Sequence, residues 1–208
     1  MKTKIALAIH RLGISANFLT VSGLILAALS GWLIFRGEFF LASAVLLTSG
    51  IFDMLDGAVA RVSGKESAFG GILDSSLDRY GDSFLFAGLV FYFFQLNRLD
   101  LAVLSVSAWT GSFLISYVRA RVECEFDSCR VGFWERGERL GVLIVALAVN
   151  NVAGVVWLLG IGTHWTALQR LYSATPNAPK FKTPTRFNWV YFAKVIFLAM
   201  AILFVRFP

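Results

Sequence analysis

The sequence contains little charge: only 15% of its 208 residues are Asp, Glu, Lys or Arg, whereas 57% are hydrophobic. A soluble domain carries about 25% charged residues. The surplus of apolar side chains is too large for the core of one soluble domain, so lipid must surround most of the surface. The composition therefore predicts an all-α integral membrane protein.

Soft metal ligands are also scarce, because the chain has two cysteines and two histidines. A structural zinc site needs four ligands close together, and His10 and His164 lie far in sequence from Cys124 and Cys129. We interpret the cysteines as two separate thiols, with a loop disulfide as the alternative. The N-terminus lacks a signal-peptide cleavage pattern. The sequence has neither an internal repeat nor a low-complexity segment, which predicts a single domain over residues 1–208.

Runs of about 20 apolar residues mark membrane-spanning helices. Residues 1–12 place their apolar side chains on one side, which predicts a short juxtamembrane helix at the interface. Asn150 and Asn151 indicate a turn between the fifth and sixth spans, whose boundaries can shift by several residues. Residues 174–187 form a polar linker on the cytoplasmic side. The predicted spans are 17–35, 39–60, 69–96, 100–121, 138–157, 158–173 and 188–206.

The basic residues test this order of spans independently. An N-terminus inside the cell leaves only Arg36, Arg98 and Arg206 on the outer side, as the positive-inside rule requires. We therefore predict a multi-pass protein of the cell membrane whose net charge of +6 faces anionic headgroups and phosphate substrates. Nucleic acid is not expected as a partner, because these residues are spread over short loops. The cytoplasmic set is Lys2, Lys4, Arg11, Arg61, Lys65, Arg119, Arg121, Arg130, Arg136, Arg139, Arg170, Lys180, Lys182 and Arg186.

Carboxylates are concentrated where the second and third spans meet. Asp53 and Asp56 are three residues apart, and Asp74 and Asp78 are four apart, so each pair lies on one helix face. The connection at 63–65 is short, which makes the two helices antiparallel neighbours. Four carboxylates at similar depth form an oxygen-lined pocket that calls for a hard cation such as Mg²⁺ or Mn²⁺.

Two other interpretations of the aspartates are available. Buried salt bridges with Arg61 and Arg79 would leave two arginines against four acids, and such pairs are costly. A cation or proton transporter also places acids inside a membrane, but broken helices at the midplane and an inverted repeat are typical of that class. The sequence has neither feature. Arg61 lies two turns beyond Asp53, where a guanidinium can bind a phosphate at the membrane surface.

The aspartate region resembles the signature of the CDP-alcohol phosphatidyltransferase family, and the resemblance extends over residues 1–175. It implies a bundle of six membrane helices with a juxtamembrane helix before it, which makes 188–206 an extra C-terminal span. The matching pattern is Asp53-x-x-Asp56-Gly57-x-x-Ala60-Arg61, eight residues, then Gly70-x-x-x-Asp74-x-x-x-Asp78.

The resemblance implies roles for the site residues. Asp78 serves as general base, and two Mg²⁺ or Mn²⁺ ions are the expected cofactors. The implied donor is CDP-diacylglycerol or CDP-archaeol, and the reaction releases CMP. The resemblance also implies a homodimer. The implied metal ligands are Asp53, Asp56, Asp74 and Asp78, and the implied contacts to the CDP group are Asn17, Gly57, Arg61 and Ser67.

Five arginines collect at the predicted cytoplasmic ends of the fourth to sixth spans. They can anchor the helices to headgroups, but their number favours an acceptor alcohol that carries a phosphate, whose geometry guanidinium groups match. These segments resemble phosphatidylinositol-phosphate synthases, and equally archaetidylinositol-phosphate synthases. The resemblance implies that Arg119, Arg139 and Arg170 hold inositol phosphate. Glycerol 3-phosphate is the alternative acceptor.

Overall fold

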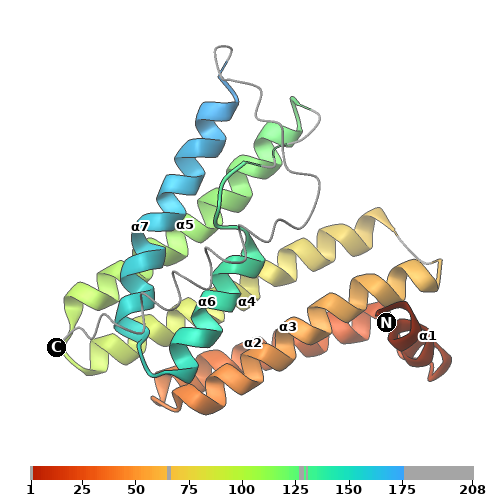
Figure 1. The fold of residues 1–208 in the computed structure, drawn as a ribbon, viewed down its shortest axis with the longest axis horizontal. Helices are drawn as coiled ribbons and strands as arrows, with labels where there is room; N and C mark the ends of the chain where they lie inside the picture. Colours follow the sequence, from red (N-terminus) through yellow and green to blue (C-terminus); the bar gives the residue numbers. More distant parts are fainter. Residues whose placement is uncertain (1, 65–66, 127–128, 130, 176–208) are drawn as a thin grey trace. The chain divides into compact units, whose positions relative to one another are not determined.

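The structure, a computed structural model, describes the chain except for residues 1, 65–66, 127–128, 130 and 176–208. The described part consists of seven helices joined by turns and loops, without a strand, which confirms the all-α prediction (Figure 1). The helices are α1 Lys2–Arg11, α2 Ala16–Phe35, α3 Phe39–Val62, α4 Ala68–Gln95, α5 Leu99–Glu123, α6 Arg136–Ala148 and α7 Val152–Ser173.

The first four predicted spans match α2 to α5 to within two residues at each end. Within the described part, α2, α3 and α5 are long and apolar enough to cross a membrane. A span of about 20 residues is what the hydrocarbon core requires. The predicted span 188–206 and nearly all of the linker 174–187 lie outside the described residues.

The predicted boundary between the fifth and sixth spans is wrong. α6 ends at Ala148 rather than at 157, and α7 begins at Val152 rather than at 158. The asparagine turn itself is present: Asn150 has a φ of 58°, and the Asn151 side chain accepts a hydrogen bond from the Gly154 N–H at 3.2 Å. Asparagine tolerates the left-handed conformation and caps helices well. Hydropathy alone could not place this break, because apolar residues continue on both sides of it.

Residues 1–88 form one compact unit, which contains α1, α2, α3 and the first part of α4. α2 packs along α3, and α1 packs on α3, where Ala6 joins Leu19, Ala58 and Val59 in a buried cluster. The predicted juxtamembrane helix is therefore present. It holds the start of α2 against the end of α3.

Small and hydroxyl-bearing residues bring the helices of this unit close together. A Cβ atom on Gly31 of α2 would clash with the backbone carbonyl of Phe84 in α4, and one on Gly88 would clash with Gly31. Ser49 Oγ of α3 donates a hydrogen bond to the Gly23 carbonyl of α2 at 2.8 Å. Such close backbone approach is typical of helix packing in membranes, where small residues form the contacts.

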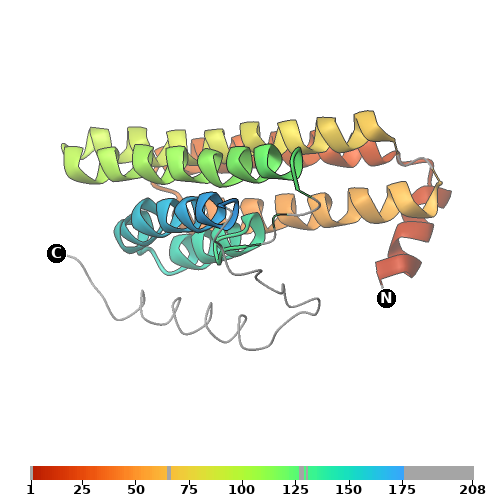
Figure 2. The same ribbon diagram turned by 90° about the horizontal axis from the view of Figure 1, so that it is seen from above.

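Residues 89–208 form a second compact unit, so the boundary between units lies within α4. In its described part, α5 packs against α7, and α6 lies beside α7 (Figure 2). Ser107 Oγ of α5 donates to the Gly160 carbonyl at 3.1 Å and lies 3.1 Å from His164 Nε2. These contacts fix α5 and α7 side by side. The single domain stays a prediction.

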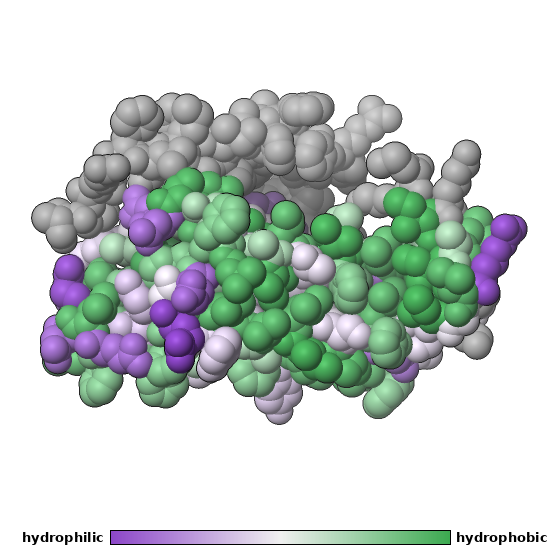
Figure 3. Space-filling view, turned by 90° about the horizontal axis from the view of Figure 1, so that it is seen from below, coloured by the Kyte–Doolittle hydropathy of each residue, from purple (hydrophilic) through white to green (hydrophobic). Residues whose placement is uncertain are grey.

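Large apolar side chains remain exposed on the helices. On α2, for example, Phe18, Ile25 and Trp32 are each more than half exposed. Figure 3 shows a face on which hydrophobic residues cover much of the described surface. This surface suits acyl chains, as the composition predicts for a protein in a bilayer.

Candidate active site

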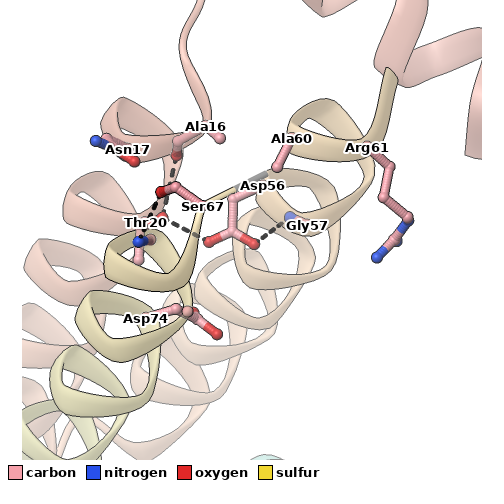
Figure 4. Close-up of a pocket in the computed structure, with 11 residues that line it drawn as sticks. Ala16, Asn17, Thr20, Asp56, Gly57, Ala60, Arg61, Ser67 and Asp74 are labelled. Atoms are coloured by element: carbon pink, nitrogen blue, oxygen red, sulfur yellow. Dashed lines mark hydrogen bonds between the residues drawn. The ribbon is translucent and has the colours of Figure 1, made fainter. Parts of the chain in front are cut away.

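A cavity of about 220 Å³ opens in the first unit, where α2, α3 and the start of α4 meet. Its walls combine carboxylates, an arginine, an amide, two hydroxyls and three glycines (Figure 4). The lining residues are Ala16, Asn17 and Thr20 from α2, then Asp56, Gly57, Ala60 and Arg61 from α3, and Ser67, Gly70, Gly71 and Asp74 at and after the start of α4.

Three of the four predicted metal ligands come together at this cavity. One carboxylate oxygen from each of Asp53, Asp56 and Asp74 lies within 4.8 Å of the others. Asp56 is only 5% exposed, and the other two are partly exposed. Three carboxylate oxygens at this spacing, one of them from a buried residue, fit the requirements of a hard divalent cation.

Asp78 lies one turn beyond Asp74 on α4 and is not part of this group of three. Its Oδ2 atom is 3.7 Å from Nη2 of Arg79, and its side chain is 15% exposed. The salt-bridge interpretation therefore has support at Asp78. Its roles as ligand and base stay predictions.

Thr20 contributes to the site, although the sequence analysis did not identify it. Its hydroxyl donates to Asp56 Oδ2 at 2.8 Å and lies 3.1 Å from the Ala16 carbonyl, while Asp56 Oδ1 accepts from the Gly57 N–H. Both oxygens of this carboxylate are therefore oriented (Figure 4). The signal that could have found Thr20 is its position one turn after Asn17, on the same face of α2.

All four predicted contacts to a CDP group line the cavity: Asn17, Gly57, Arg61 and Ser67. A Cβ atom on Gly57 would lie 3.6 Å from Nη1 of Arg61, which is an ordinary contact distance and shows that the guanidinium lies beside this glycine. Ser67 Oγ accepts a hydrogen bond from the Gly70 N–H at 3.0 Å at the beginning of α4. A helix N-terminus offers N–H donors and a positive dipole end, both of which favour phosphate.

In the second unit, the predicted acceptor arginines lie near enough for their charges to interact, because Arg119 and Arg139 both repel Arg170. Arg170 is 2% exposed; its Nε donates to the Val131 carbonyl at 2.8 Å and its Nη1 to the Ile115 carbonyl at 2.7 Å. This arginine therefore ties the 124–135 loop to α5 as well as adding charge.

Arg139 also supports the loop. It is 3% exposed, and its Nη1 donates to the Trp134 carbonyl at 3.0 Å, while the Trp134 N–H donates to Thr166 Oγ1 at 3.3 Å. Arg119 is less buried than Arg139 and Arg170, because its side chain is 42% exposed. Cys124 and Cys129 beside it are both free, which confirms the prediction of two thiols.

The arrangement of carboxylates, arginine and glycines matches one family model. Residues 13–173 match the model of the CDP-alcohol phosphatidyltransferases. The chain belongs to this family. A CDP-alcohol phosphatidyltransferase is a phosphotransferase, so the protein is an enzyme, and the transporter interpretation is not supported.

Curated relatives within this family are named as synthases of archaetidylinositol phosphate or phosphatidylinositol phosphate. The chain is 35% identical to the archaetidylinositol phosphate synthase of Pyrococcus horikoshii over 172 residues, which are 82% of this chain and 89% of that one. It is 31% identical to the phosphatidylinositol phosphate synthase of Mycobacterium tuberculosis over 182 residues, which are 82% and 84% of the two chains.

Solved structures of the Mycobacterium tuberculosis phosphatidylinositol phosphate synthase have the same fold. The crystal structure with CDP-DAG bound has a TM-score of 0.78 and 28% identity, and covers 90% of this chain and 99% of that one. The structure of that enzyme with manganese and citrate has a TM-score of 0.77 at 28% identity and covers 90% and 94%. The predicted resemblance of this CDP-alcohol phosphatidyltransferase to inositol-phosphate synthases is confirmed.

Proposed function

We propose that this enzyme transfers a phosphatidyl-type group from a CDP-lipid to a hydroxyl of inositol phosphate and releases CMP. The observation that supports it most is the cavity in which Asp56, Asp74 and Arg61 meet around space for a ligand. The two named relatives differ in lipid, one being an archaetidyl and the other a phosphatidyl synthase. Both CDP-diacylglycerol and CDP-archaeol are therefore retained as donors.

The donor binds in the cavity of the first unit. Arg61 supplies a planar guanidinium for the pyrophosphate, and the N-terminus of α4 with Ser67 supplies hydrogen-bond donors. Asn17 offers an amide that can pair with the polar edge of cytosine. The CDP-DAG that is bound in the Mycobacterium tuberculosis structure supports this assignment.

The carboxylates hold divalent metal, for which we propose two Mg²⁺ or Mn²⁺ ions and Asp53, Asp56, Asp74 and Asp78 as ligands. The manganese complex of the Mycobacterium tuberculosis enzyme supports the choice of metal. Metal bound here supplies positive charge that offsets the pyrophosphate and the departing CMP. Thr20 and the Gly57 N–H hold Asp56 in its orientation.

Asp78 acts as the general base in this proposal. It accepts the proton of the acceptor hydroxyl while the hydroxyl oxygen forms a bond to the lipid-bearing phosphorus. The bond between that phosphorus and the bridging oxygen breaks, and CMP leaves with the electron pair. A hydroxyl with a pKa near 15 needs a base within hydrogen-bond reach for this attack. The partial exposure of the Asp78 side chain gives the proton a route to water.

The acceptor binds through its phosphate to the cluster of Arg119, Arg139 and Arg170. The repulsion of Arg170 by Arg119 and Arg139 supports the proposal, because a phosphate bound near them offsets the charge of more than one guanidinium. We further propose that the enzyme lies in the cell membrane with this cluster facing the cytoplasm, and that it is a homodimer. Glycerol 3-phosphate carries the same phosphate and is the alternative acceptor.

The test is CMP release from CDP-diacylglycerol and from CDP-archaeol by the purified enzyme with Mg²⁺ or Mn²⁺. The acceptors are inositol phosphate, inositol, glycerol 3-phosphate and serine. We expect turnover with inositol phosphate and little with inositol. Faster turnover with glycerol 3-phosphate would favour the alternative, and turnover with free inositol or serine would contradict a phosphorylated acceptor.

A further inference from the structure

A carboxylate lies within the arginine cluster of the second unit. Glu123, the last residue of α5, accepts a hydrogen bond from Arg119 Nε at 3.0 Å through its Oε1 atom. The same oxygen accepts the Cys129 N–H at 3.3 Å, and Glu123 interacts electrostatically with Arg170. Glu123 therefore forms a hydrogen bond with Arg119 and is attracted electrostatically by Arg170.

A neighbouring pair shows that this arrangement differs from an ordinary surface ion pair. Arg121 and Glu125 have the same spacing on the chain, but their closest atoms are 3.5 Å apart and both side chains are about 65% exposed. The side chains of Arg119 and Glu123 are 42% and 34% exposed. Glu123 also has its second contact from the loop backbone, which fixes the position of its carboxylate.

The charge of the cluster requires a counter-anion when the acceptor is absent. Arg139 and Arg170 are almost fully buried, and their hydrogen bonds to carbonyl oxygens leave their positive charges in place. Buried charge without an opposite charge nearby is costly. Glu135 acts electrostatically on Arg170 and Glu138 on Arg139, while Glu123 supplies opposite charge to Arg119, in the place where an anionic ligand of Arg119 would bind.

We propose that Glu123 is the internal counter-anion of Arg119 within the cluster and that the phosphate of the acceptor displaces it from this arginine. The inference rests on the proposed function, because it takes a phosphate monoester as the acceptor's binding group. Phosphate carries more charge than a carboxylate and can accept from several guanidinium groups at once. The Cys129 N–H keeps hold of the released carboxylate, so the end of α5 stays joined to the loop.

The experiment compares Glu123→Gln with the matched control Glu125→Gln in the full-length enzyme in neutral detergent. Glutamine keeps an oxygen for the Cys129 N–H but removes the competing charge. We expect the KM for inositol phosphate to fall about two- to fivefold in Glu123→Gln, the range in which exposed ion pairs contribute, with kcat unchanged. Inorganic phosphate should raise the melting temperature of this variant more than that of the wild type. Glu125→Gln should match the wild type in both measurements.

Several outcomes would overturn the proposal. An unchanged or raised KM in Glu123→Gln means that Glu123 only supports the loop or orients Arg119. An equal fall in Glu125→Gln means that any lost negative charge at this surface has the same effect. If Glu123→Gln does not fold, Glu123→Asp replaces it: its charge remains, so its KM should stay near the wild-type value, and a fall would contradict displacement.

The failure of the proposed function gives a different result. In that case Arg119→Ala leaves the acceptor KM unchanged, and inorganic phosphate does not stabilise the wild type. If Arg119→Ala raises the KM while Glu123→Gln behaves as wild type, only the present inference fails. Phosphatidic acid added to the micelles tests a lipid source of the phosphate. Stabilisation by this lipid but not by free phosphate would overturn the role of a soluble acceptor.

Discussion

At the scale of single residues, the aspartates of this site differ in their surroundings. Asp56 is buried and both of its oxygens accept hydrogen bonds, whereas Asp78 lies one turn from the group of three and beside Arg79. A carboxylate that is fixed by hydrogen bonds suits metal binding, because its geometry does not change on binding. One with access to water suits proton transfer.

This difference predicts that substitutions of the aspartates reduce activity in two ways, through weaker metal binding or through slower turnover. Asp53→Asn, Asp56→Asn and Asp74→Asn should each weaken Mn²⁺ binding, as measured by electron paramagnetic resonance, and extra Mg²⁺ or Mn²⁺ should restore part of the activity. Asp78→Asn should retain CDP-lipid binding but lose about 10²- to 10⁴-fold in turnover, the usual cost of a missing general base. Full activity of Asp78→Ala, or of the wild type in excess EDTA, would contradict the mechanism.

Thr20 predicts a more specific effect. Thr20→Val removes the hydroxyl that donates to Asp56 at 2.8 Å while keeping the shape of the side chain. Hydrogen bonds to charged groups contribute about 1.5–3 kcal/mol. We therefore expect Mn²⁺ affinity to fall about 10- to 150-fold, with recovery in Thr20→Ser. The control is Thr48→Val, because the exposed Thr48 hydroxyl bonds only to the Ala44 carbonyl of its own helix in the described structure. Equal Mn²⁺ affinity in Thr20→Val and wild type would rule out this positioning role.

Much of the site could be predicted, because its carboxylates lie at fixed spacings along the sequence. Carboxylates three or four residues apart share a helix face, so Asp53, Asp56 and Asp74 could be placed together. Thr20 was missed, although it lies one turn after Asn17, since a threonine in an apolar helix most often bonds to its own backbone. Nor could the carbonyl bonds of Arg139 and Arg170 be expected, because they depend on a loop whose path is set by tertiary contacts.

At the scale of helices, α2 and α4 depend on glycine for their close approach. A Cβ on Gly31 would meet the backbone of Phe84, which cannot rotate away as a side chain can. Overpacking of this kind typically costs 1–3 kcal/mol. Gly31→Ala should therefore lower the melting temperature in detergent, and Gly31→Val should lower it further. Gly50→Ala in α3 is the control, because nothing lies within 4 Å of its added Cβ and alanine favours a helix. A Gly31→Ala variant as stable as Gly50→Ala would contradict the close contact.

The helices themselves were predictable to different degrees. α2 to α5 are separated by charged or glycine-containing turns, so their ends could be read to within two residues. Between α6 and α7 no charged residue interrupts the apolar run. The break depends on the left-handed Asn150 and the cap by Asn151, which are signals of local geometry and not of hydropathy.

At the scale of the whole molecule, the distribution of Lys and Arg predicts one orientation in the membrane. Single cysteines at positions 65, 150 and 180, in a background without Cys124 and Cys129, can be labelled with an impermeant maleimide in intact cells. We expect labelling at position 150 but not at 65 or 180, because the positive-inside rule predicts the cytoplasmic side for the latter two. Labelling at 65 and 180 but not at 150 would reverse the orientation.

The docking of Trp134 on Thr166 explains why α6 is so short. Thr166 lies seven residues before the end of α7, which is about 10 Å of helix rise. α6 begins two residues after Trp134 and has 13 residues, or about 20 Å. From Thr166 back to the start of α7 at Val152 is also about 20 Å of rise, so 13 residues are enough for α6 to reach the turn that precedes α7.

The segment directly before α6 is irregular, and two of its carbonyl groups, those of Trp134 and Val131, accept hydrogen bonds from the buried guanidinium groups of Arg139 and Arg170. Non-helical backbone at membrane depth is tolerated only where protein buries it or a water-filled cavity adjoins it. The two arginines therefore act in place of water here, as hydrogen-bond donors that let the chain leave helical structure on its way to α6.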